Sequence, residues 1–281
     1  MNKTALITGG SSGLGLASAE ALAKEGFDLI LVARGERRLR TETARLRNEF
    51  PQIAIKDFVL DISNQGAVRE FAKNITSPLD VLMNNAGLMG PDYALSPEGI
   101  ESQMATNHIG HFLLTSLLWS NLEETKGRVV SISSVVHRRS KMQAESKEEI
   151  QGKTESYNRW GRYADSKLAC LLFARELDIR AKQLGSKVLS IAAHPGWALT
   201  GLQANYPNTF DFLAQKAAVG ARSQIRAALD PALRGGEFVG PRFEAWGEPK
   251  LISGSRHSKN LELAQRLWKY SEELTSSKFL G

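Results

Sequence analysis

A glycine-rich turn near the N-terminus constrains the fold of this chain most. The apolar run Ala5 to Ile7 leads into Thr8-Gly9-Gly10-Ser11-Ser12-Gly13-Leu14-Gly15, and apolar residues at helical spacing follow from Leu16 to Ala23. Glycines let the backbone turn tightly, and the N-terminus of a helix offers unpaired N–H groups and about half a positive charge. A strand, a glycine turn and a helix in this order predict a phosphate-binding site.

Two common phosphate-binding patterns do not match this turn. A Walker A loop needs Lys and Ser or Thr directly after Gly15, where this chain has Leu16 and Ala17. The strict dinucleotide pattern G-x-G-x-x-G needs a glycine at the position of Ser18. The spacing of the glycines at positions 9, 13 and 15 after Thr8 is therefore a different fingerprint.

Short apolar runs and helical patterns alternate along the chain. Strands are expected over 3–8, 27–33, 53–60, 79–83, 127–133 and 187–193, with a last edge strand over 237–239. Helices are expected over 16–23, 36–48, 64–74, 99–121, 163–184 and 261–268, with a polar surface excursion over 136–160. This alternation predicts an α/β fold, a doubly wound parallel sheet with helices on both faces. With 281 residues, 42% of them hydrophobic, residues 1–281 suffice for one domain.

An arginine stands at the end of the second predicted strand. In dinucleotide-binding folds an acidic residue near this place binds the ribose 2′-OH, whereas an arginine accommodates a 2′-phosphate. Arg34, with Arg37 and Arg38 just beyond it, therefore predicts NADP. The alternative is that Arg37 and Arg38 form a basic first helical turn that faces water.

A tyrosine and a lysine lie four residues apart in the segment Tyr163-Ala164-Asp165-Ser166-Lys167. On a helix the two side chains share one face, one turn apart. Two unit charges about 4 Å apart interact by about 1 kcal/mol in water but about 4 kcal/mol at an effective dielectric constant of 20. The ammonium can therefore favour the phenolate strongly only where other parts of the chain cover the pair.

Composition excludes several classes of protein. The net charge of +6 is spread along the chain without a nucleic-acid-binding motif, so it indicates a solvated surface and no nucleic-acid partner. Cys170 is the single cysteine, which excludes a disulfide framework and favours a reducing, cytoplasmic location. His108 and His111 lack a third ligand nearby in the sequence, so no metal site is expected. No signal peptide is expected, and the apolar run 112–119 is far shorter than the roughly 20 residues of a membrane span.

Five motifs together resemble the short-chain dehydrogenase/reductase family over nearly the whole chain. They are Thr8-Gly9-x-x-x-Gly13-x-Gly15, Asn84-Asn85-Ala86-Gly87, Asn107, Ser134 and Tyr163-x-x-x-Lys167. The segments 107–115, 194–196 and 266–268 further resemble the branch of retinol dehydrogenases and WW-domain oxidoreductases. The resemblance implies a Rossmann-type sheet of about seven strands in the order 3-2-1-4-5-6-7, with a small substrate lid over residues 195–222.

The resemblance also assigns catalytic roles. It implies that Tyr163 is the general acid, that Lys167 favours the phenolate and holds the nicotinamide ribose, and that Asn107 anchors a proton-relay water. Ser134, the last residue of the strand motif, matches the family serine that binds the substrate oxygen, rather than Ser133. These four residues are the expected catalytic set.

The cofactor contacts follow from the same resemblance. The implied contacts are Thr8, Gly9, Ser11, Ser12, Gly13, Leu14, Gly15, Arg34, Asp61, Ile62, Asn85, Ala86, Gly87, Tyr163, Lys167, Pro195, Gly196, Trp197 and Thr200. Some NADP-dependent members place a basic residue where Ser12 stands, so selectivity here rests on Arg34. NADP(H) is favoured, and NAD(H) stays an alternative.

The expected activity is hydride transfer between NADP(H) and a carbonyl or alcohol carbon of a small apolar substrate. Aromatic residues between Trp197 and Phe212 favour an apolar lid, although packing on the core would explain them equally well. The alternatives are a reductase of C=C bonds, as in relatives that act on enones or protochlorophyllide, and a nucleotide-sensing protein without turnover. A monomer, a homodimer and a homotetramer all stay open.

Overall fold

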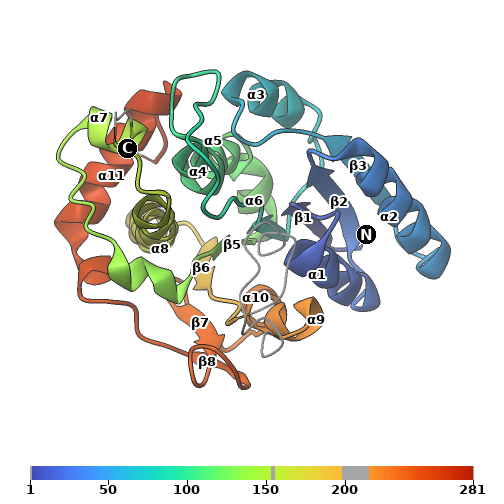
Figure 1. The fold of residues 1–281 in the computed structure, drawn as a ribbon. Coiled ribbons are helices and arrows are strands. Elements are labelled where there is room, and N and C mark those ends of the chain that lie inside the picture. The colour runs from blue at the N-terminus through green and yellow to red at the C-terminus, as the bar shows by residue number, and fades with distance from the viewer. Residues whose placement is uncertain (1, 153–155, 198–214, 281) are drawn as a thin grey trace.

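Eight strands form one sheet in the computed structural model, which describes residues 2–152, 156–197 and 215–280. The strands are β1 (Thr4–Thr8), β2 (Asp28–Ala33), β3 (Ile55–Val59), β4 (Val81–Asn84), β5 (Arg128–Ile132), β6 (Leu189–Ala193), β7 (Phe238–Pro241) and β8 (Pro249–Leu251). Their order is β3-β2-β1-β4-β5-β6-β7-β8 (Figure 1). The first seven strands are parallel, which confirms the predicted fold class and strand order.

Helices cover both faces of this sheet. They are α1 (Gly13–Lys24), α2 (Glu36–Glu49), α3 (Gln65–Lys73), α4 (Ser102–Met104), α5 (Gly110–Leu117), α6 (Trp119–Thr125), α7 (Lys147–Gln151), α8 (Arg159–Gln183), α9 (Ala217–Gly220), α10 (Arg222–Leu229) and α11 (Leu261–Thr275). Figure 1 shows α1, α9 and α10 on one side of the sheet and α4, α5, α6 and α8 on the other. The result is the three-layer arrangement expected of a parallel sheet that is buried on both faces.

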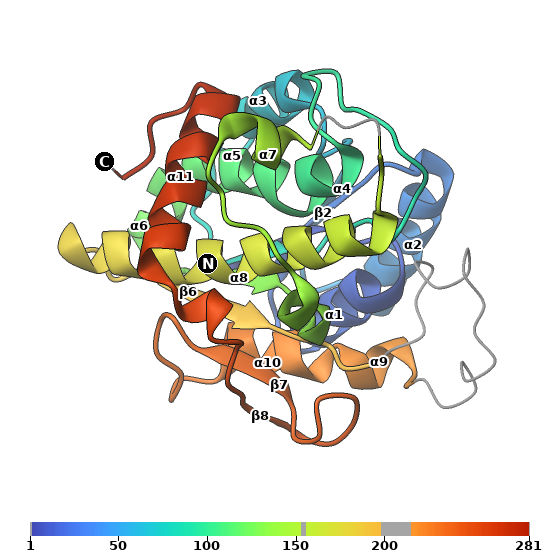
Figure 2. The ribbon, with the colours of Figure 1, turned by 60° about the vertical axis from the view of Figure 1, so that its left-hand side comes forward.

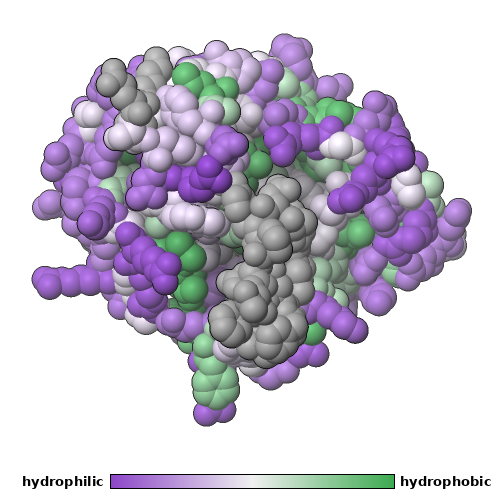
Figure 3. All heavy atoms as spheres, viewed as in Figure 1, coloured by the Kyte–Doolittle hydropathy of each residue, from purple (hydrophilic) through white to green (hydrophobic). Residues whose placement is uncertain are grey.

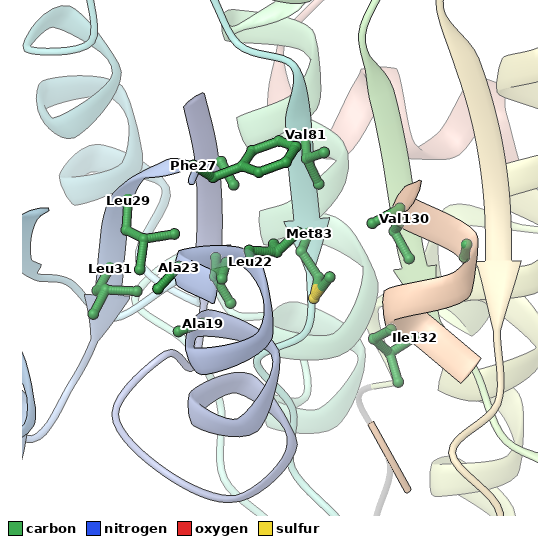
Figure 4. Packing of buried hydrophobic residues seen from close by; sticks show 14 of the residues in the cluster. Ala19, Leu22, Ala23, Phe27, Leu29, Leu31, Val81, Met83, Val130 and Ile132 are labelled. Carbon is green, nitrogen blue, oxygen red and sulfur yellow. The ribbon is translucent and has the colours of Figure 1, made fainter. Parts of the chain in front are cut away.

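The core divides into two because successive strand residues point to opposite faces. Ala5 and Ile7 of β1 pack with α1, α2 and α10, whereas Leu6 between them packs with α3, α5, α6, α8 and α11. Figure 4 shows the first of these clusters, in which Leu22 of α1 lies among side chains of the central strands. Each face of the sheet is thereby covered by an apolar layer.

The edge of the sheet differs from the prediction. The segment 237–239 was expected to form the last edge strand, but this was wrong: β7 pairs with β6 on one side and with β8, antiparallel, on the other. β8 has three residues, begins with a proline and is largely exposed. Such a strand carries no apolar alternation, so only its pairing with β7 defines it.

The helix expected over 99–121 is interrupted. It consists of α4, a π-helical segment over Ala105–Ile109, α5 and α6, and Leu118 separates the last two. The apolar spacing continues through these breaks, so the periodicity of the sequence does not register them. Isolated π-helical turns occur frequently at functional sites. This turn contains Asn107.

Helix α8 is long and largely buried. Its buried residues include Tyr163, Lys167 and the apolar run Leu168 to Ala174. It lies between strands β5 and β6 on one side and α11 on the other, as Figure 2 shows. The side chain of Asn158 accepts a hydrogen bond from the Gly161 N–H and starts the helix four residues before the predicted position. The family tyrosine therefore stands in the second turn of a firmly held helix.

The surface is largely hydrophilic. The face in Figure 3 shows only separate hydrophobic spots between charged side chains. Within the described ranges, no helix has the length and apolar character needed to cross a membrane. Of the expected lid over 195–222, residues 198–214 lie outside the described residues, and so does Thr200.

Helix α5 packs closely against the turn after β3 at its first residue, Gly110. A methyl group on Gly110 would overlap the carbonyl oxygen of Ile62. Gly110→Ala is therefore expected to lower the free energy of unfolding by about 1–3 kcal/mol, the usual cost of overpacking. Gly66→Ala in α3, where a methyl group meets only ordinary contacts, is the matched control and should cause no loss. Urea unfolding measures both, and equal stability of the two variants would contradict this packing.

Candidate active site

A cleft lies at the carboxyl ends of β1, β2 and β4, where the strand order reverses. It has a volume of ≈ 690 Å³. Eighteen residues line it: Thr8, Gly9, Ser11, Ser12, Gly13, Leu14, Gly15, Val32, Ala33, Arg34, Gly35, Arg38, Leu60, Ile62, Asn85, Ala86, Gly87 and Thr106. In open α/β sheets ligands bind at such a switch point. From the expected set the cleft brings together the predicted contacts of the glycine-rich turn, Arg34, Ile62 and the loop 85–87, whereas Asp61 does not line it.

The glycine-rich turn directs a helix N-terminus into this cleft. Helix α1 begins at Gly13, and Ser12 before it makes no side-chain capping bond to the first turn. A methyl group on Gly15 would overlap the carbonyl oxygen of Gly9, so only glycine lets the two ends of the turn approach so closely. Backbone N–H groups and the helix dipole at this place suit a pyrophosphate.

Two arginines border the cleft beside β2. Arg34 and Arg38 both line it, and the guanidinium of Arg34 lies 3.8 Å from the carboxylate of Asp61. Arg37 is exposed and is not among the lining residues. Asp61 itself contacts Arg34 and the Ser63 N–H and hydroxyl group, and Ile62 next to it lines the cleft. Arg38 therefore adds a second guanidinium group to the cleft, beside that of the predicted Arg34.

The hydroxyl group of Thr8 joins the glycine-rich turn to the loop after β4. Its Oγ1 accepts hydrogen bonds from the backbone N–H groups of Asn85 and Ala86, each at 2.9 Å. The side chain of Asn85 donates in return to the carbonyl oxygen of Thr8 at 2.7 Å and contacts Gln224 of α10 at 3.2 Å. The two loops that border the cleft are thereby held in one arrangement.

The tyrosine and the lysine of α8 are both covered, as their proposed chemistry requires. Tyr163 is 8% exposed and Lys167 is 6% exposed. The ammonium of Lys167 donates a hydrogen bond to the carbonyl oxygen of Ile132 at 3.0 Å and lies 5.7 Å from the centre of the Tyr163 ring. The pair therefore lies against the end of β5, out of bulk water.

Asn107 connects three elements around this pair. Its side-chain amide accepts from the Leu88 N–H and donates to the Leu88 carbonyl and to the hydroxyl of Ser166 on α8. Gly87 lies beside both Asn107 and Lys167, because a methyl group there would be 3.1 Å from Asn107 Oδ1 and 3.6 Å from Lys167 Nζ. The segment after β4 and helix α8 therefore meet at Asn107.

The two serines after β5 have different surroundings. Ser133 is buried and donates its hydroxyl hydrogen to the carbonyl oxygen of Lys167 at 2.7 Å. Ser134 is partly exposed, and its hydroxyl oxygen accepts only a 3.3 Å contact from the Val136 N–H. Ser133 is thus occupied in holding α8, which leaves Ser134 as the serine with hydrogen-bonding capacity at the end of the strand.

The segment after β6 rests on the hairpin between β7 and β8. The N–H of Trp197 donates to the carbonyl oxygen of Ala245 at 3.0 Å, and the rings of Trp197 and Trp246 lie 5.9 Å apart. A methyl group on Gly196 would meet the same Ala245 carbonyl at 2.6 Å. Pro195, Gly196 and Trp197 do not line the cleft described above, so the structure places them beside the hairpin.

Several residues around the site were not among the contacts that the sequence analysis predicted. Arg38 and Thr106 line the cleft, and Gln224 bonds Asn85, Ser18 and the Leu14 carbonyl from beneath the glycine-rich turn. Arg38 was named in the sequence analysis within a cluster of arginines but not as a contact. Its place about one helical turn after Arg34 was the available signal. Gln224 belongs to no motif and is far away in sequence, so nothing marked it.

Four histidines of the described chain are buried, and three of them, at positions 108, 111 and 194, have a strongly lowered pKa. Burial lowers the pKa of His108 to about 3, and that of His111 and His194 to about 4. Nearby charge adds to the effect, from His111 on His108 and from Lys167 on His111. All three rings are therefore neutral at pH 7. In the described part of the chain, no three His, Cys, Asp or Glu side chains gather closely enough to hold a metal ion.

Comparisons with known proteins agree with this geometry. A family model described as short chain dehydrogenase matches residues 3–146. The chloroplastic short-chain dehydrogenase TIC 32 B of Brassica napus is 32% identical, over 98% of this chain and 89% of the relative. Retinol dehydrogenase 12 of Bos taurus is 31% identical, over 97% of this chain and 86% of the relative.

A solved structure extends the likeness to three dimensions. An uncharacterized protein from Mycobacterium paratuberculosis has a TM-score of 0.85 at 37% identity, over 99% of this chain and 94% of that one. The chain therefore belongs to the short-chain dehydrogenase family, in its retinol-dehydrogenase-like branch. This is a family of oxidoreductases that bind a nicotinamide cofactor and act on CH–OH or C=O groups of small molecules.

The buried histidines predict a loss of stability in mild acid. A histidine in the unfolded chain has a pKa of about 6.5, above the folded values of about 3 to 4. The unfolded state therefore binds more protons below pH 6.5, and stability falls as the pH falls toward 4. Each histidine contributes up to about 1.4 kcal/mol per pH unit within this window.

Urea unfolding at pH 7.5, 6 and 5 measures this slope. His108→Gln, which removes one titrating ring, should reduce the slope by about 1.4 kcal/mol per pH unit whatever its effect at pH 7.5. A free energy of unfolding that stays constant between pH 6.5 and 5 would contradict the neutral, buried state of these rings.

Proposed function

We propose that this protein transfers a hydride between NADP(H) and a carbonyl or alcohol carbon of a small apolar substrate. The observation that carries the proposal is the covered Tyr163 and Lys167 pair beside Asn107 and Gly87, next to a cleft with a phosphate-binding turn. A protein that only senses a nucleotide has no need of a proton donor at this place.

The cleft suits a dinucleotide. The N-terminus of α1 would hold the pyrophosphate, Arg34 and Arg38 the 2′-phosphate, and the loop 85–87 would support the nicotinamide half. When bound, the nicotinamide supplies the hydride or accepts it. Pro195, Gly196, Trp197 and Thr200 remain proposed contacts of the same half.

The proton chemistry belongs to residues of the chain. In the reductive direction Tyr163 donates its phenolic proton to the substrate oxygen, and Ser134 donates a hydrogen bond to the same oxygen. Lys167 stabilises the phenolate that remains, because its ammonium lies on the same helix face within the covered site. In this proposal Asn107 anchors the water through which the proton is replaced.

Apolar side chains near the loop after Gly87 support an apolar substrate. Trp160, one turn before Tyr163 on α8, lies against Gly90 and is 48% exposed. Trp197 and Trp246 form an aromatic pair beside the hairpin. We propose that these surfaces, together with a lid over 195–222, form the walls of the substrate site.

NADP(H) as the cofactor rests on the charge at the end of β2. A short-chain dehydrogenase from Sphingobium yanoikuyae solved in complex with NADPH is 25% identical, with a TM-score of 0.61 over 79% of this chain and 82% of that one. Together with the two arginines on the cleft, this relative supports NADP(H) over NAD(H).

The first prediction from this proposal concerns Tyr163. Tyr163→Phe removes the transferable proton but keeps the ring, so kcat for NADPH-dependent reduction of aldehydes or ketones should fall about 10²-fold or more, with little change in NADPH affinity. Lys167→Ala should weaken NADPH binding and lower kcat together. Tyr270→Phe on the distant α11, where the hydroxyl bonds the Glu145 carbonyl, is the control and should turn over normally. Near-normal turnover of Tyr163→Phe would overturn the proposed function.

The second prediction concerns cofactor choice. Arg34→Ala and Arg38→Ala should each raise the Kd of NADPH about 10- to 100-fold, the scale of a lost charge-assisted hydrogen bond, and leave the Kd of NADH nearly unchanged. Arg37→Ala is the matched control, because this neighbouring arginine does not line the cleft. Fluorescence titration measures all three variants. Equal binding of NADPH and NADH by the wild-type protein would contradict the proposed phosphate site.

A further inference from the structure

His111 lies between the cofactor loops and Asn107, and the proposed reaction assigns it no part. Its ring is 2% exposed, on the first turn of α5. Nε2 lies 2.8 Å from the hydroxyl oxygen of Thr8, and Nδ1 lies 3.2 Å from the carbonyl oxygen of Asn107. One imidazole thus contacts both the phosphate-binding turn and the π-helical turn that carries the family asparagine.

The contacts of Thr8 determine which nitrogen of His111 carries the proton. The hydroxyl oxygen of Thr8 already accepts two backbone N–H groups, those of Asn85 and Ala86. Its single hydrogen must therefore be donated, and the nearer acceptor is His111 Nε2 at 2.8 Å rather than the Met83 carbonyl at 3.3 Å. The ring is neutral because burial lowers its pKa to about 4, so its one N–H is on Nδ1 and donates to Asn107.

The chain of hydrogen bonds continues to the tyrosine helix. The carbonyl oxygen of Asn107 also accepts from the thiol of Cys170 at 3.1 Å, which fixes the backbone of the π-helical turn from α8. The side chain of Asn107 donates to the hydroxyl of Ser166 at 2.8 Å, and Ser166 donates to the carbonyl oxygen of Tyr163 at 2.8 Å. Every bond in this series runs through buried or partly buried groups.

We propose that His111 is a positioning residue that couples the cofactor loops at Thr8 to Asn107 and, through Ser166, to the helix that carries Tyr163. The proposal rests on the proposed function for its effect on turnover, but the hydrogen bonds themselves do not depend on any reaction. A bound dinucleotide that fixes the loops at 8–15 and 85–87 also fixes the turn at Asn107. His111 therefore links cofactor binding to the geometry of the proton donor.

His108, one turn earlier, provides an internal comparison. It is equally buried, and its Nε2 lies 2.8 Å from the hydroxyl oxygen of Ser271 on α11. Ser271 donates its own hydrogen to the Leu267 carbonyl at 2.7 Å, so His108 carries its proton on Nε2 and donates it. The two histidines thus have opposite tautomers, and only His111 contacts the cofactor loops.

The first test measures these tautomers directly. Nitrogen-15 NMR of the imidazole rings in the wild-type protein at pH 7 should show the Nδ1–H form for His111 and the Nε2–H form for His108. Because this needs neither cofactor nor variant, it remains decisive even if a substitution at His111 does not fold. An Nε2–H form at His111 would overturn the proposal, and it would do so without bearing on whether Tyr163 is catalytic.

The second test compares two apolar substitutions at matched burial. His111→Phe should raise the Kd of NADPH about tenfold and lower kcat by a similar factor, because the link between the loops and Asn107 is lost. His108→Phe should lower Tm comparably while the Kd of NADPH stays within twofold. Equal effects of both variants on NADPH binding would show a structural role alone and overturn the proposal.

A double-mutant cycle isolates the coupling. Thr8→Val keeps the shape of the side chain but removes the hydroxyl that bonds His111. Thr8→Val combined with His111→Phe should weaken NADPH binding by clearly less than the product of the two single effects, because both remove the same link. Strictly multiplicative effects would overturn the coupling, whereas normal turnover of Tyr163→Phe would contradict only the proposed function.

Discussion

The buried ammonium of Lys167 is the constraint on which the arrangement of the site depends. An unpaired charge in a protein interior is costly, so its donors must have partners. The structure supplies one at the end of β5, where the Ile132 carbonyl accepts from Lys167, and Ser133 donates back to the Lys167 carbonyl. These two bonds fix α8 along the strand. The position of Tyr163, one turn away, follows from them, and a shift of α8 would leave the charge without its acceptor.

The sequence predicted the parts of this site that are set by local backbone geometry. A strand, a glycine turn and a helix are recognisable between residues 3 and 23, and a helix places Tyr163 and Lys167 on one face by its period alone. The parallel sheet followed from the alternation of apolar runs with helical patterns. The π-helical turn at Asn107, the strand β8 and the support from Gln224 were not predictable. The π-helical turn is a local change of hydrogen-bond spacing inside a continuous apolar pattern, and β8 is a three-residue strand without apolar alternation. Gln224 depends on hydrogen bonds to residues far away in sequence, which leave no periodic trace.

The helices that carry Asn107 and Tyr163 are also joined at their N-termini by a buried ion pair. Glu101 caps α4 through the Gln103 and Met104 N–H groups, and its second oxygen accepts from Arg162, the residue before Tyr163. Replacing a whole buried ion pair by apolar residues is often neutral, but removal of one partner leaves an uncompensated charge. The pair therefore contributes mainly a fixed register between the two helices rather than net stability.

The ion pair at one end and the bond from Asn107 to Ser166, one turn further along α8, join the two helices at two points, which resists both sliding and rotation of one against the other. The loops over 8–15 and 85–87, which hold the proposed cofactor contacts, have no such double attachment to α8. Gly87 lies beside Lys167, whereas the loop 85–87 is held by Thr8 at Ala86 and the residue after it, Leu88, by Asn107. Asn107 bonds both Ser166 on α8 and Leu88 after the loop 85–87, so it sets the distance between Tyr163, the proposed proton donor, and the proposed cofactor contacts.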